Sequence, residues 1–235
     1  MKKLLGILAV LATLAGCSAP ASPPAEPGTT SVAPAGKSST QAGAPDASAP
    51  ADQPAAPANT AKKATLGAGT YKVPAKLKAG RYVITPTGKK TGNLSITTED
   101  DPLYINEILG VSKLGGRTMG VPSVTCDIPE GATIKLQGVG ATFAPAVRKP
   151  STTLSAGWWT VGSDIPAGDY TATPTKGESG NFVVYDDGGF PQTNEILGES
   201  KIGKTTMGVP DVAVSLSDGQ TIHIGGISKV TFKNG

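Results

Sequence analysis

NEILGVSKLGGRTMGVPSV (residues 106–124) recurs as NEILGESKIGKTTMGVPDV (residues 194–212), with 14 of 19 positions identical. The similarity extends outward from this stretch on both sides. Residues 66–138 align with residues 154–226 at a constant shift of 88 without a gap, and 30 of these 73 positions are identical. Self-similarity over this length predicts an internal duplication, so we treat the chain as two copies of one module.

Each copy has the pattern of β structure. Short runs rich in Val, Ile, Thr and Tyr are bounded by clusters of Gly, Pro, Asn and Asp, as in RYVITPT (81–87) and its counterpart DYTATPT (169–175). No segment shows a 3.6-residue hydrophobic period over ten residues or more, which argues against helices. We therefore predict an all-β fold of two tandem, duplicated, small antiparallel β-sandwich or barrel-like modules at 66–144 and 154–235, joined by a short linker at 145–153.

The shared stretch has two interpretations. Nearly half of all identities fall in it, while the net charge around it changes from +3 (nine basic and six acidic side chains in 66–143) to −4 (five and nine in 154–233). This contrast favours architecture, with Asn106 capping a short helical turn begun at Glu107. The expected core contacts are Ile108, Leu109, Met119 and Val121, and Gly110, Gly115, Gly120 and Pro122 set the backbone. The alternative is a twin ligand site with Glu107, Glu195, Lys113 and Lys201 as its polar candidates.

The N-terminal residues have the pattern of an export signal. Lys2 and Lys3 precede an apolar run at 4–15, which is shorter than the ~20 residues of a membrane-spanning helix. The run ends in LAGC (14–17), which resembles the lipobox of bacterial lipoproteins. This resemblance implies that a signal peptide of residues 1–16 is removed and that Cys17 is diacylated. Because two acyl chains anchor far better than one, we expect a lipid anchor in the cell membrane, with the chain on the extracytoplasmic face.

Residues 17–65 start with this cysteine and continue as a tether. Positions 18–65 are mostly Ala, Pro, Ser, Thr and Gly, with nine prolines and no aromatic residue. Such a segment buries too little apolar surface to offset the entropy of ordering it, so we predict a disordered linker. Its reach is roughly 40 Å as a flexible coil, or about 150 Å as polyproline II. A Ser/Thr-rich stalk open to O-glycosylation is the alternative interpretation.

Charge and cysteine content narrow the range of partners. Without residues 1–16 the chain has 19 basic and 18 acidic side chains, which gives no electrostatic basis for binding nucleic acid. Cys126 has no partner for a disulfide apart from the predicted lipidated cysteine. Valine occupies its place in the second copy, at Val214, so we expect Cys126 to be a small buried hydrophobe.

Little in the sequence points to catalysis, and we expect no cofactor. His223, the only histidine, alternates with Ile222 and Ile224, so it should face solvent. A Ser–His–Asp arrangement would depend on this residue alone. Two acidic loops contain weak calcium candidates, but their spacing matches no EF-hand and acidic turn residues often bond locally, so we predict no metal site. These candidates are Glu99, Asp100, Asp101, Asp186 and Asp187.

Trp158 is the aromatic residue with the strongest functional interest. It matches Thr70 in the first copy, whereas its neighbour Trp159 matches Tyr71 and shares parity with Val161, which places Trp159 toward the core. Trp158 should then point outward. We expect it to make a contact between the modules or to lie at a part-buried edge, and the alternative is a ligand contact in which its ring stacks on a sugar.

VGSDIPAGDY (161–170) resembles a strand–turn–strand segment of the short repeated β-domains of Gram-positive surface lipoproteins, whereas VPAKLKAGRY (73–82) departs from it at Leu77 and Lys78. Such domains are generally of unassigned function, so the resemblance implies location more than activity, and a Gram-negative host stays open. Our leading hypothesis is a membrane-anchored, non-enzymatic binding or envelope-structural lipoprotein whose partner is a cell-wall polymer, a glycan or a surface protein. The alternative is an accessory subunit that docks on a membrane protein complex, and a surface hydrolase is the third hypothesis.

Overall fold

The computed structural model describes residues 61–235, except 102–103, 115–116 and 203–204. The predicted signal peptide (1–16), Cys17 and nearly all of the predicted linker lie outside the described residues. Within the described residues the fold is all-β, as the sequence predicts, and its elements are strands joined by turns. A search of the same residues finds no helix with the length and apolar character needed to span a membrane.

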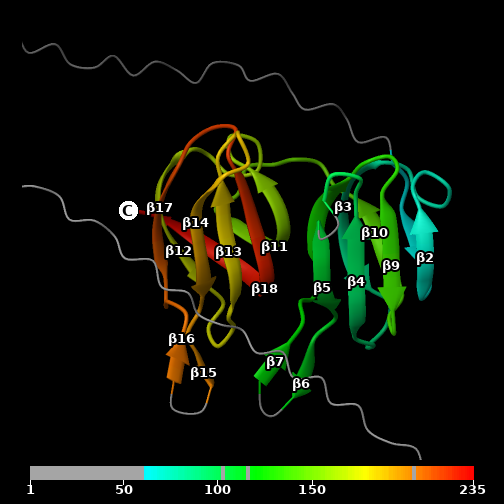
Figure 1. The fold of residues 1–235 in the computed structure, drawn as a ribbon, viewed down its shortest axis with the longest axis horizontal. Helices are drawn as coiled ribbons and strands as arrows, with labels where there is room; N and C mark the ends of the chain where they lie inside the picture. Colours follow the sequence, from blue (N-terminus) through cyan, green and yellow to red (C-terminus); the bar gives the residue numbers. More distant parts are fainter. Residues whose placement is uncertain (1–60, 102–103, 115–116, 203–204) are drawn as a thin grey trace, which may run out of the picture. The chain divides into compact units, whose positions relative to one another are not determined.

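The first module contains two four-stranded antiparallel sheets (Figure 1). One has the order β1-β10-β3-β8 and consists of β1 (Ala64–Leu66), β10 (Ala141–Pro145), β3 (Gly80–Pro86) and β8 (Val124–Ile128). The other has the order β2-β9-β4-β5 and consists of β2 (Gly69–Lys72), β9 (Thr133–Gln137), β4 (Gly92–Thr97) and β5 (Ile105–Leu109). A hairpin of β6 (Ser112–Leu114) and β7 (Arg117–Met119) extends away from these sheets between β5 and β8.

The second module repeats this plan with two longer strands. β11 (Thr153–Thr160) takes the places of β1 and β2, and β18 (Thr221–Asn234) takes the places of β9 and β10. The register between them shifts at residues 155–157, where β11 passes from one sheet to the other. The remaining strands are β12 (Gly168–Pro174), β17 (Val212–Leu216), β13 (Gly180–Tyr185) and β14 (Pro191–Leu197), with a hairpin of β15 (Ser200–Ile202) and β16 (Thr205–Met207).

Alternating side chains along the strands build one core in each module. The same ring pair closes both cores: Tyr82 packs edge-on against Phe143 with centroids 6.1 Å apart, and Tyr170 packs edge-on against Phe232 at 6.0 Å. Each of these tyrosines donates its hydroxyl to the backbone carbonyl four residues earlier, at 2.7 Å and 3.1 Å. The two phenylalanines are 89 residues apart, so the repeat continues past residue 138 with one residue inserted.

The duplicated stretch forms a backbone arch in each module. After the β6–β7 hairpin the chain returns to β5, where Val121 donates its N–H to the Ile108 carbonyl at 2.8 Å. The second copy repeats this bond from Val209 to Ile196 at 2.9 Å. Gly120 follows the hairpin with a φ of 77°, and a Cβ there would lie 2.6 Å from the Ile108 carbonyl oxygen. Because no other residue fits this close approach, the arch itself requires part of the identity between the copies.

Two details predicted for the shared stretch are wrong. Asn106 and Glu107 lie within β5, so Asn106 caps no helical turn. Strand alternation then turns Leu109 into the core and Ile108 outward, and Ile108 is 40% exposed rather than a core contact. Val121 is buried as predicted, whereas Met119 is only half-buried.

Candidate functional site

The two modules are joined by a parallel pairing of β8 with β11. Ala156 lies opposite Val124, and Gly157 lies opposite Thr125. The pairing joins the β1-β10-β3-β8 sheet of the first module to the strands of the second module in one ten-stranded sheet, and β2-β9-β4-β5 stays separate. A Cβ at Gly157 would overlap the backbone carbonyl of Thr125, so the strands approach this closely only because residue 157 is glycine. Ala156, although part of the second module, is fully buried in the core of the first.

Trp158 lies in the contact between the modules, at the centre of an aromatic cluster. Its indole Nε1 donates to the carbonyl of Tyr104 in the first module at 2.7 Å, and the two rings stack 5.6 Å apart at an interplanar angle of 7°. His223 and Tyr185 of the second module lie 4.5 Å and 5.5 Å from the Trp158 ring, also stacked. The outward direction predicted for Trp158 therefore leads it onto the neighbouring module.

His223 was expected to face solvent, and this prediction is wrong. It is directly opposite Trp158 in the pairing of β11 with β18, and the indole covers its ring. The side chain is half-buried, and burial lowers its pKa, an effect that the negative charge of Asp101 partly opposes. The imidazole is therefore held in its neutral form at neutral pH.

A network of four charges lies beside this cluster. Buried Arg81 of the first module donates to Asp127 at 2.7 Å and to buried Asp164 of the second module at 3.1 Å. Arg148, from the segment between the modules, donates to the same two carboxylates. Arg81 also donates to the Trp158 carbonyl at 3.2 Å, and its guanidinium lies 5.0 Å from the centre of the Trp159 ring. The network therefore ties both modules and the segment between them together.

Glu107 is the third component of the contact. Its side chain is 7% exposed, and its two carboxylate oxygens accept the N–H of Gly226 in the second module at 3.1 Å and 3.2 Å. Burial raises the pKa of this carboxyl to about 7, and the hydrogen bond from Gly226 lowers it in part. Glu195, its counterpart, lies half-buried on β14.

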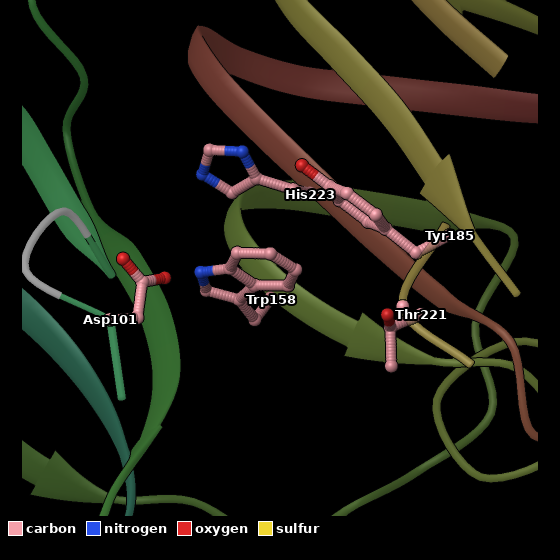
Figure 2. A pocket seen from close by; sticks show the side chains of 6 residues that line it. Asp101, Trp158, Tyr185, Thr221 and His223 are labelled. Carbon is pink, nitrogen blue, oxygen red and sulfur yellow. The ribbon is translucent and has the colours of Figure 1, made fainter. Parts of the chain in front are cut away.

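A hollow of about 400 Å³ opens beside the aromatic cluster (Figure 2). The Asp101 carboxylate of the first module faces the rings of Trp158 and His223, and Tyr185 and Thr221 line the opposite part. A second hollow, of about 450 Å³, lies next to Glu107 and shares His223 with the first. Flat rings, a carboxylate and a hydroxyl around a hollow of this size are the features of a small-ligand site.

The other predicted site residues do not gather here. Lys113 donates to Thr118 within the β6–β7 hairpin, and the side chain of Lys201 lies outside the described part of the chain. The polar groups of the predicted twin site are therefore divided: Glu107 serves the module contact, whereas Glu195 and Lys113 lie elsewhere. Cys126 is fully buried as predicted, and burial raises the pKa of its thiol to about 12.

The acidic loops act as turns. Asp101 receives the Thr98 N–H on its carbonyl at 2.9 Å, and the Asp186 carboxylate accepts the Phe190 N–H at 2.8 Å and the Gln192 amide at 2.9 Å. Glu99, Asp100 and Asp187 are exposed. Among the described residues no three His, Cys, Asp or Glu side chains form a group that could hold a metal ion.

Sequence reasoning missed several residues of the contact: Tyr104, Tyr185, Arg81, Arg148 and Asp164. A signal for some of them was present in the comparison of the copies. Arg81 aligns with Asp169, and Asp164 aligns with Lys76, so the charge is reversed at both positions of one ion pair. Such reversals within a duplicated fold mark positions where the copies have different neighbours.

Comparisons with known proteins add no family to this description. A scan against protein-family models matches none, and neither the curated proteins nor the solved structures include one that matches this chain. The functional argument therefore rests on the residues of the site.

Proposed function

We propose that this chain is a membrane-anchored, extracytoplasmic lipoprotein without catalytic activity, which binds a sugar unit of an envelope polymer at the hollow between its modules. The observation that carries the proposal is the Trp158 cluster, in which stacked rings border a hollow with a carboxylate, a hydroxyl and an imidazole at its edge. Sugars present apolar C–H faces and a ring of hydroxyls, so an aromatic face with polar groups at its rim fits both.

The chemistry of the rim supports binding rather than turnover. Asp101 and Thr221 lie at opposite sides of Trp158, and each can hydrogen-bond a sugar hydroxyl (Figure 2). His223, which a Ser–His–Asp hydrolase would need as its general base, stacks on Trp158 with one face. Its lowered pKa leaves a neutral imidazole that can accept or donate one hydrogen bond to a ligand.

The anchor is proposed from the sequence. Cys17 is the last residue of the LAGC motif that closes the apolar run, and a diacylated cysteine would fix the chain to the membrane with the Pro-rich segment as spacer. Growing the producing cell with a labelled fatty acid should label the unaltered chain and leave the Cys17→Ser variant unlabelled. Equal labelling of the variant would contradict lipidation at Cys17.

Retention on purified cell-wall polysaccharide tests the ligand. The Thr221→Val variant should lose at least tenfold in retention, because it removes a rim hydroxyl while keeping the side-chain volume. Its matched control is Thr133→Val, at the equivalent position of β9 in the first module, which should bind like the unaltered chain. Trp158→Ala should abolish retention and Trp158→Phe should keep part of it, because phenylalanine preserves a flat face. No retention of the unaltered chain on any envelope polymer would refute the carbohydrate proposal.

A second candidate function, docking on a membrane protein complex, is favoured by one observation. The two modules expose the same apolar residue beside their hairpins: Ile108 is 40% exposed and Ile196 is 38% exposed, and Met207 near the second hairpin is 39% exposed. Paired apolar projections suit a protein surface better than a glycan. Cross-linking in intact cells separates the candidates, because docking predicts one dominant protein partner that is lost when both isoleucines are replaced with Ser.

A further inference from the structure

The contact between the modules uses a different side of each. The first module contributes the edge of β8, and the second contributes residues 155–157 of β11. A contact between unlike surfaces of equivalent units is head-to-tail, and it leaves one copy of each surface unused at the ends. Here the unused surfaces are the edge of β17, which is the counterpart of β8, and residues 67–69, which are the counterpart of 155–157.

Within the described residues, neither of these surfaces has a strand partner on its outer side. β17 ends the ten-stranded sheet, since it pairs only with β12. Ala68, which precedes β2, and Gly69, its first residue, repeat the Ala156–Gly157 pair, yet Ala68 is exposed where Ala156 is fully buried. An exposed edge strand in a soluble domain is a ready template for a further strand.

The backbone needed for pairing is retained at the free end. A Cβ at Gly69 would lie 3.1 Å from the hydroxyl of Tyr71, which donates to the Gly67 carbonyl at 3.0 Å. Trp159 makes the equivalent bond to the Ser155 carbonyl at 2.8 Å in the internal contact, so this bond is compatible with strand pairing at the glycine. On the accepting side, Val212 and Ala213 stand where Val124 and Thr125 receive β11. Ala213 is exposed and small, so nothing on it obstructs a strand at that distance.

The charges at the free ends are complementary with their signs exchanged. In the internal contact Arg81 of the accepting module pairs with Asp164 of the donating module at 3.1 Å. The corresponding residues at the free ends are Asp169 on the accepting side and Lys76 on the donating side, and both are exposed. The net charge of each module has the same sign as its residue in this pair: residues 66–143, which include Lys76, are net positive, and residues 154–233, which include Asp169, are net negative.

A second polar contact is preserved without change. Glu107 accepts the N–H of Gly226, and both residues recur at the free ends as Glu195 and Gly138. Gly138 has the same φ of 74° as Gly226 and is exposed. The free ends therefore repeat the strand pairing, one ion pair with reversed signs, and the glutamate–glycine contact.

We propose that this chain associates head-to-tail with further copies of itself, with residues 67–69 of one copy pairing in parallel with β17 of the next. The contact lacks the counterparts of Trp158 and Tyr104, which are Thr70 and Gln192, so it is weaker than the internal one. Association is accordingly reversible, depends on concentration and weakens as salt screens the Lys76–Asp169 pair. This inference is independent of any glycan ligand.

Disulfide trapping in the full chain tests the geometry. In the internal contact the hydroxyls of Ser155 and Thr125 lie 3.3 Å apart, and their counterparts are Gly67 and Ala213. The Gly67→Cys/Ala213→Cys variant should form a ladder of dimers, trimers and longer species on mild oxidation. Each single variant should give no ladder, and a mixture of the two should give a dimer. Absence of the ladder, or a dimer formed equally well by one single variant, would overturn the proposal.

Charge reversal in the trapping background separates specific pairing from random collision. Adding Lys76→Asp should lower the yield of the ladder at least tenfold, because two carboxylates then face each other. Adding Asp169→Lys as well should restore it. Both positions are exposed, so folding is unaffected. A ladder unchanged by Lys76→Asp, or one that Asp169→Lys fails to restore, would contradict head-to-tail pairing at these residues.

Discussion

Arg81 in the first module and Asp169 in the second occupy the same position of the repeat, but their surroundings differ completely. Arg81 is 5% exposed and joins an ion-pair network across the module contact, whereas Asp169 lies on the surface and accepts a hydrogen bond from Ser215. Trp158 and Thr70 differ in the same way, because the indole packs on the neighbouring module and the threonine is exposed. The fold of the two positions is the same, and only the neighbour has changed.

This difference separates two kinds of sequence requirement within one chain. Gly120 and Gly208 are identical because each arch needs a positive φ and close backbone approach. The side chains of the ion-pair network and of the aromatic cluster are not identical between the copies, because each module uses only one of its two contact sides within the chain. Identity at the arch glycines therefore marks architecture, and a change of charge or ring at a fixed fold position marks a contact that only one copy makes. Substitutions at equivalent positions put this comparison to the test.

The largest expected effect is at the strand junction. Gly157→Ala should lower the free energy of unfolding by about 5 kcal/mol, because the new Cβ overlaps the Thr125 backbone and the strands must separate. Gly69→Ala carries a similar penalty for positive φ, with values of 155° and 132° at the two glycines, but meets only the Tyr71 ring. It should cost about 1 kcal/mol. Urea unfolding of both variants measures the difference, and equal losses would show that the contact contributes nothing.

The buried ion pair comes next. Arg81→Met should destabilise the chain by about 4 kcal/mol, because it leaves the buried Asp164 carboxylate with one guanidinium fewer. The matched change Asp169→Asn, at the exposed counterpart, should stay within about 0.5 kcal/mol. Adding Asp164→Asn to Arg81→Met should recover part of the loss, since the uncompensated charge is then removed. A large effect of Asp169→Asn would break the comparison.

Glu107 and Glu195 should contribute differently to the pH dependence of folding stability. Burial raises the pKa of Glu107 from 4.5 to about 7, so between these values the folded chain holds a proton that the unfolded chain has lost. Stability from this group is therefore highest below pH 4.5 and falls as pH rises through 7. Glu107→Gln should remove that slope and gain up to about 3 kcal/mol relative to the unaltered chain between pH 4.5 and pH 8. Thermal unfolding across this range measures it, and Glu195→Gln, the control, should leave the slope in place.

Much of the fold could be predicted from the sequence. The duplication, the all-β class and the buried place of Cys126 all followed from comparing the copies and from period-two patterns. Residues 105–109 were missed as a strand, because a buried Glu107 interrupts the apolar alternation that would have shown it. The strand around Phe143 was missed because the aligned region ends before it, where one inserted residue shifts the repeat.

The site was harder to predict, for a physical reason. Trp158 could be singled out because strand alternation predicts that it faces outward, at a position where the first copy has a threonine. Its partners, however, are distant in sequence. Tyr104 is 54 residues away and Arg81 is 77 residues away, and the pattern of a single strand contains no information on what packs against its outer face. His223 was misplaced for the same reason, because alternation predicts which face a side chain takes and not whether another module covers that face.

The smallest expected effect concerns the duplicated stretch itself. Ile108→Thr and Ile196→Thr should each lower the free energy of unfolding by about 1 kcal/mol, because each isoleucine partly covers the glycine that closes its arch. If the shared stretch is architecture, the two losses are equal and add within about 0.5 kcal/mol in the double variant. If it is a twin docking site, stability is unchanged and in-cell cross-links to a partner protein disappear. Suppose that both variants lose the same free energy of unfolding and keep their cross-links. The two isoleucines are then identical because each packs on the backbone of its arch, and the apolar surface that they expose is a consequence of that packing.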